Sequence, residues 1–70
     1  MFREALTENL SDMLIISQLQ KLGFKRTKGL LGLDIYEDKY ENKVFLDTET
    51  YKIEDIDIAD KKLLKKVQAL

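Results

Sequence analysis

The spacing of apolar residues changes twice along this chain, and these changes limit the folds that it can adopt. From Phe2 to Leu22 apolar residues recur every three or four positions, as on one face of a helix. From Phe24 to Ile56 they alternate with polar residues, as in half-buried strands, and from Ile58 to Ala69 the helical spacing returns. The sequence therefore predicts a helix, a group of strands and a second helix.

Gly23 is the predicted end of the first helix. A glycine after the last periodic residue can take the left-handed conformation that closes a helix, and Phe24 can then fold back onto the last turn. Ser11 could cap a new helix within this segment. The sequence thus leaves open whether residues 2–22 form one helix or two, and we favour one.

Alternating segments predict three strands at Leu33–Asp38, Lys43–Thr48 and Tyr51–Glu54. The polar residues 39–42 end in Asn42, a residue type that tolerates the backbone angles of a tight turn, so the first two strands should form a hairpin. The run FKRTK adds a short strand before them. The last helix is expected at Ile58–Ala69, with Asp57 as its cap and Asp60 in its first turn. Its buried side should carry Leu63, Leu64, Val67 and Leu70.

These elements predict an α+β fold with a small single-layer antiparallel sheet of three to four strands. An N-terminal and a C-terminal helix pack on one face of the sheet, in α-β-β-β-α order, and residues 1–70 make a single small domain. We expect the helices to cover the face that carries Leu33, Ile35, Val44, Leu46 and Ile53. The opposite, open face then carries Asp34, Tyr36, Asp38, Lys43, Phe45, Asp47, Lys52 and Glu54.

The open face is the candidate site for protein association. Its candidate interaction residues are Tyr36, Phe45, Lys43 and Lys52, two aromatic side chains among charges. The 70-residue chain has no Cys and no His, so it lacks the disulfides and the usual metal ligands that stabilise small folds, and a partner would help it. We expect a small non-enzymatic interaction module, of the accessory kind common in bacteria and phages. It would act through homo- or hetero-association, by way of the open face or an edge strand.

Enzymatic activity is not expected from this composition. Without His or Cys, acid–base chemistry would fall to carboxylates, Lys or Tyr, and the acidic residues show no signature spacing. Asp34, Asp38 and Asp47 could supply oxygen ligands, but Lys43 and Lys52 are expected on the same face, so no metal or cofactor is predicted. The longest apolar run is the four residues Met13–Ile16, far shorter than a membrane span. A soluble cytoplasmic protein is expected.

The stretch KGLLG, residues 28–32, has two interpretations. As a G-x-x-G loop beside Lys25, Arg26 and Lys28, it could let backbone N–H groups approach phosphates. As a turn, Gly29 and Gly32 would supply positive φ angles while the two leucines pack beneath. We favour the turn, because the stretch lies between segments of strand character and its middle residues are apolar.

Nucleic-acid binding is the alternative function. Two basic blocks could serve it if folding brought them together: Lys25, Arg26 and Lys28, and Lys61, Lys62, Lys65 and Lys66. The net charge of −1 opposes this function, because phosphate neutralisation dominates affinity for nucleic acids.

The order helix, Gly23-Phe24, three strands and helix, with Lys28-Gly29 opening the second strand, resembles the HicA-type mRNA interferase toxins. The resemblance implies a fold similar to the double-stranded RNA-binding domain. The family places its catalytic His shortly after that glycine, where this chain has Leu30 and Leu31. No functional residue is carried over, and the resemblance argues against that activity.

Overall fold

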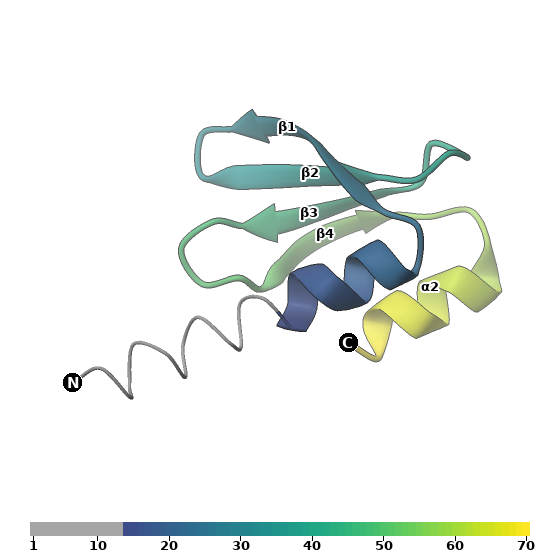
Figure 1. The fold of residues 1–70 in the computed structure, drawn as a ribbon. Coiled ribbons are helices and arrows are strands. Elements are labelled where there is room, and N and C mark those ends of the chain that lie inside the picture. The colour runs from purple at the N-terminus through teal and green to yellow at the C-terminus, as the bar shows by residue number, and fades with distance from the viewer. Residues whose placement is uncertain (1–13) are drawn as a thin grey trace.

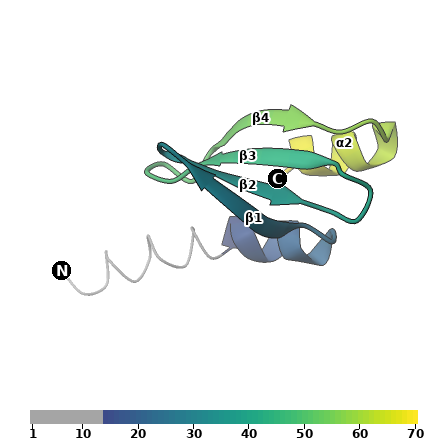
Figure 2. The same cartoon turned by 90° about the horizontal axis from the view of Figure 1, so that it is seen from above.

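Four strands form one antiparallel sheet in the computed structural model, which describes residues 14–70. In sheet order they are β1 (Lys25–Leu30), β2 (Leu33–Glu37), β3 (Lys43–Asp47) and β4 (Ile53–Asp57). A helical segment over residues 14–21 precedes the sheet, and α2 (Lys61–Gln68) follows it. Both helices lie on the same side of the sheet (Figures 1 and 2). The predicted α+β class is confirmed, with four strands.

The first helix ends as the sequence predicts. Gly23 has a φ of 96°, in the left-handed region. Its N–H donates to the Gln20 carbonyl at 3.0 Å, and the Phe24 N–H donates to the Leu19 carbonyl at 3.0 Å. Phe24 and Leu19 are both fully buried, so the apolar contact that usually accompanies this closure is present. The part of the predicted helix before residue 14, including Ser11, lies outside the described residues.

The core lies between the sheet and the two helices. Its buried members are Leu19, Phe24, Tyr36, Val44, Leu46 and Val67. In the β2–β3 register Tyr36 pairs with Val44, and directly paired residues share a face of the sheet. The side chain of Tyr36 therefore faces the helices.

This register corrects the predicted faces of β2. Leu33 and Ile35 were expected beneath the helices, but they pair with Asp47 and Phe45 and share the open face with them. Asp34 pairs with Leu46 and belongs to the helix side. Both alternating sets of β2 contain apolar residues, so periodicity alone could not choose between them. The turn over residues 38–42, which fixes the register, makes the choice. For Val44, Leu46 and Ile53 the predicted face is correct.

Two predicted boundaries near the C-terminus also differ. The last strand covers Ile53–Asp57 instead of Tyr51–Glu54, because the turn after β3 extends to Tyr51, which has a φ of 56°. Asp57 therefore ends β4 and does not cap α2. The cap is Asp60, whose carboxylate accepts from the N–H groups of Lys62 and Leu63.

Candidate interaction surface

The open face carries two continuous rows of side chains across all four strands. The pairings align Lys28, Ile35, Phe45 and Asp55 in one row, and Lys25, Glu37, Lys43 and Asp57 in the next. In the second row the Lys43 ammonium lies 3.6 Å from the Glu37 carboxylate. Within residues 14–70, neither helix covers this face.

An apolar group lies at the centre of this face and runs toward the β1–β2 turn. We call Leu30, Leu33, Ile35 and Phe45 the open-face cluster. Leu30 pairs with Leu33, and Ile35 pairs with Phe45. Ile35 is buried, Leu33 and Phe45 are half-buried, and Leu30 is 53% exposed. The cluster therefore presents apolar surface to solvent mainly at Leu30.

The stretch KGLLG, for which a phosphate-binding loop and a turn were both considered, contains the β1–β2 turn. Leu31 and Gly32 form the turn between β1 and β2, and Gly32 has a φ of 84°. The Gly32 carbonyl accepts from the Thr48 N–H at 3.0 Å and from the Thr48 hydroxyl at 3.2 Å, which ties this turn to the one after β3. Gly29 lies within β1 and has no positive φ, so the expectation of two turn glycines is right for Gly32 and wrong for Gly29.

The leucines of this turn do not pack beneath it, contrary to expectation. Leu31 is fully exposed, and Leu30 is more than half exposed. Leu31 adds a fully exposed apolar side chain at the tip of the hairpin, next to Leu30 in the chain. The sequence could have predicted that one of these leucines is exposed. Two adjacent leucines in a turn between two strands cannot both point into a core that lies on one face of the sheet.

The structure keeps two of the four predicted interaction residues on this face. Phe45 and Lys43 lie on it, as their pairings with Ile35 and Glu37 show. Tyr36 is only 4% exposed and belongs to the core, so it cannot take part in an interface on the open face. Lys52 is exposed but lies in the connection before β4, outside the strands.

The position of Tyr36 in the core changes the pKa of its phenol. Burial raises the pKa of its phenol, and the neighbouring Asp34 carboxylate acts in the same direction, while Arg26 opposes them. The phenol therefore stays neutral at physiological pH, as a core residue should.

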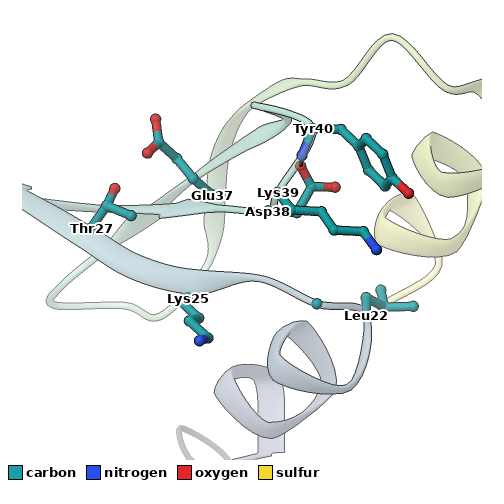
Figure 3. Close-up of a pocket in the computed structure, with 8 residues that line it drawn as sticks. Leu22, Lys25, Thr27, Glu37, Asp38, Lys39 and Tyr40 are labelled. Atoms are coloured by element: carbon teal, nitrogen blue, oxygen red, sulfur yellow. Dashed lines mark hydrogen bonds between the residues drawn. The ribbon is translucent and has the colours of Figure 1, made fainter.

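A second surface feature lies at the opposite end of the sheet, around the turn between β2 and β3. Tyr40 of this turn is 73% exposed, and the Lys39 ammonium lies 5.1 Å from the centre of its ring, within reach of a cation–π interaction. Figure 3 shows Lys39 and Tyr40 across a hollow of about 560 Å³ from Leu22 and Lys25. Sequence reasoning did not single out Tyr40, because an aromatic residue in a polar turn is unremarkable on its own.

The two basic blocks meet only in part at this end. Lys25 lines the hollow of Figure 3, and Lys62 and Lys66 line a second hollow of about 570 Å³ that shares Leu22 and Tyr40 with the first. Arg26 is engaged elsewhere, with its Nε 3.0 Å from the Asp34 carboxylate, and Lys28 lies on the open face. Lys61 and Lys65 line neither of these two hollows.

The β2–β3 turn is held by a polar network around Asn42, which is 7% exposed. Its amide nitrogen donates to the Asp38 carboxylate at 2.8 Å, and its amide oxygen accepts from the Ala59 N–H at 3.2 Å. Asn42 was expected to take unusual turn angles, but Glu41 takes them, with a φ of 66°. The role of Asn42 is to bind this turn to the connection between β4 and α2.

Among residues 14–70 no group of three His, Cys, Asp or Glu side chains is placed to hold a metal ion. In the same part of the chain, no helix is both long enough and apolar enough to span a bilayer. Comparisons with known protein families, with curated proteins and with solved structures find no match for this chain. The likeness to HicA-type toxins therefore stays one of element order.

Proposed function

We propose that this protein is a small non-enzymatic interaction module, which associates with itself or with a partner protein through the open face and the adjoining edge of the sheet. One observation supports this most: Leu30, at the end of the open-face cluster, and the fully exposed Leu31 beside it in the chain present apolar side chains to solvent. Apolar side chains that gather at one exposed place favour association, because contact removes their surface from water. A cytoplasmic location is part of the proposal, and the absence of Cys is consistent with it.

The test is site-specific photo-crosslinking in cells and on purified protein. A benzophenone amino acid replaces Leu31, which is fully exposed and can be changed without disturbing the core. Irradiation should yield discrete adducts, and mass spectrometry should identify either a second copy of the chain or another protein. The double change Leu30→Ser and Leu31→Ser should weaken the same association when it is measured with the purified partner.

The matched control places the crosslinker at Lys62, an exposed residue on the side of α2 turned toward the β2–β3 turn, away from the open face and from β4. It should give no discrete adduct. Equal labelling from both positions, or no adduct from Leu31, would contradict the proposal.

Nucleic-acid binding is the second candidate, and one observation favours it. Lys25, Lys39, Lys62 and Lys66 line the two hollows that share the exposed Tyr40. An aromatic ring among cations can stack on a base while the lysines meet phosphates. Acidic side chains in the same hollows, Glu37, Asp38 and Asp60, weaken the attraction, so this candidate ranks second.

Fluorescence anisotropy with short single-stranded and duplex RNA and DNA at low salt tests this candidate. The variant Lys25→Gln, Lys39→Gln, Lys62→Gln should lose binding, and Lys28→Gln, Lys61→Gln, Lys65→Gln, which removes the same charge elsewhere, should keep it. Binding of the parent should also fall steeply with salt. The candidate is excluded if no binding is seen at tens of micromolar protein.

A further inference from the structure

The two outer strands of the sheet carry opposite charges. β1 has three basic residues, Lys25, Arg26 and Lys28, and no acidic one. β4 has three acidic residues, Glu54, Asp55 and Asp57, and no basic one. All six are exposed. In residues 14–70 no other strand pairs with the outer edge of β1 or of β4. On β4 the Ile56 N–H donates to the carboxylate of Asp55 at 2.9 Å, a contact that a pairing strand would replace.

The opposite charges are in register across the sheet. The two rows of the open face each begin with a lysine on β1 and end with an aspartate on β4, Lys28 to Asp55 and Lys25 to Asp57. A copy of the sheet placed beside the first, at the same height, would therefore set Asp55 next to Lys28 and Asp57 next to Lys25. Opposite charges directly across from each other stabilise a strand pair.

Because the sheet has an even number of strands, a second copy can continue its antiparallel order. Because four strands alternate in direction, β1 and β4 run in opposite directions. A second copy in the same orientation thus continues the antiparallel pattern and keeps its helices on the same face as those of the first (Figure 2).

We propose that copies of this chain associate head to tail, with the β4 edge of one copy pairing antiparallel with the β1 edge of the next. The inference rests on the proposed function and names its partner as a second copy of the chain. Arg26 is already bound to Asp34, whereas Lys25 and Lys28 form no ion pair with the other residues of 14–70, so these two lysines provide the charge on β1. The extra residue Thr27 bulges from β1 in its pairing with β2, and the same bulge keeps Lys25 and Lys28 in step with Asp57 and Asp55 of the next copy.

The charges also exclude the alternative pairings. Two β1 edges would bring lysines together and two β4 edges would bring carboxylates together, so each like pairing is repelled. The β4 edge also offers a hollow of about 420 Å³ between β4 and α2, lined by Ile53, Ile56 and Leu64 among others, where side chains of the next copy can settle. Pairing of two different edges does not close on itself as a twofold dimer does, so it builds short rows of copies.

A charge-exchange experiment by sedimentation velocity at low ionic strength tests the proposal. The β1-reversed variant carries Lys25→Glu and Lys28→Glu, and the β4-reversed variant carries Asp55→Lys and Asp57→Lys. The parent, with a chain mass of 8.2 kDa, should form larger species as its concentration rises into the hundreds of micromolar. Each variant alone should sediment as a monomer, because residues of like charge then stand at the pairing positions of both edges. An equimolar mixture of the two should regain association, because acidic pairing positions then meet basic ones.

Circular dichroism and thermal melting establish first that both variants fold. The matched control is Lys62→Glu with Lys66→Glu, on the side of α2 that lines the hollow by the β2–β3 turn, away from the β4 edge. It changes the net charge as much as the β1-reversed variant and should associate like the parent. A mixture that stays monomeric while the parent associates would overturn the pairing. So would a parent that stays monomeric throughout. Either result leaves the adducts from Leu31 as a separate measure of the proposed function, which survives if those adducts identify a different protein.

Discussion

Gly32 is the residue whose backbone conformation the β1–β2 turn requires, and Gly29 provides an internal control three positions earlier. Gly32 has a φ of 84°, so Gly32→Ala should lower the free energy of unfolding by about 1 kcal/mol. At Gly29 an added Cβ would lie 2.7 Å from a terminal nitrogen of Arg26, the far end of a long side chain, which would have to shift from its place beside Asp34. Gly29→Ala should therefore cost less. Urea unfolding of both variants measures this, and the reverse order would contradict the assignment of the turn.

Leu46 and Phe45 are neighbours in β3 that face opposite sides of the sheet. Leu46 is 1% exposed in the core, so Leu46→Ala should cost about 2–5 kcal/mol, a large part of the stability of so small a domain. Phe45 lies half-buried on the open face, and Phe45→Thr should cost clearly less, since Thr is itself a residue that favours strands. Thermal unfolding of the two variants checks both. Equal losses would mean that the open face is covered in solution.

The sequence predicted the existence of the strands and helices more reliably than it predicted which side chains of each strand face the helices. The closure at Gly23 and the amphipathic α2 depend on local chemistry, so they could be predicted. The face of β2 depends on pairing with β3, which local spacing does not encode, and Tyr36 was therefore assigned to the wrong side. The same error placed Tyr36 in the predicted interface and left Ile35 out of it. Leu31 and Tyr40 were missed because their exposure is a property of the folded turns.

The β2–β3 turn and the β4–α2 connection act as one unit through Asn42. Asn42→Ala removes the amide that bridges Asp38 and the Ala59 N–H, and it leaves partly buried groups without partners. The free energy of unfolding should fall by about 1–3 kcal/mol. Asn42→Asp keeps the acceptor for Ala59 but sets a second carboxylate against Asp38, so it should also destabilise at neutral pH. Denaturant unfolding tests both, and a neutral effect of Asn42→Ala would show that the network contributes nothing.

Asp38 of the β2–β3 turn and Asp47, at the start of the turn after β3, should make the free energy of unfolding depend on pH in acid. Partial burial acts to raise the pKa of Asp38, but hydrogen bonds from the side chain and backbone of Asn42 and from the Tyr40 N–H outweigh it and lower the pKa. The pKa of Asp47 is lowered too, by the N–H groups of Thr50 and Glu49. A carboxylate with a lowered pKa stabilises the fold fully above its unfolded pKa of about 3.9, and this is lost as the pH falls through the folded value.

The prediction compares the parent with Asp38→Asn by urea unfolding between pH 7 and pH 2. The variant should be less stable than the parent at neutral pH, and the difference should shrink as the pH falls below about 4, because the parent then loses the same charge. A difference that stays constant over this range would mean that the charge of Asp38 does not contribute.

At the scale of the whole molecule, the two edges of the sheet carry opposite charges, with cations on β1 and anions on β4, and the two helices of residues 14–70 lie on one face. The proposed head-to-tail association links this charge asymmetry to stability. A partner that binds only the folded chain raises the midpoint of thermal unfolding by mass action. The midpoint of the parent should therefore rise with protein concentration at low salt. In 1 M salt, where the screening length is about 3 Å, the rise should be smaller. The β1-reversed variant should melt at the same temperature at every concentration, and a parent midpoint independent of concentration at low salt would contradict the association.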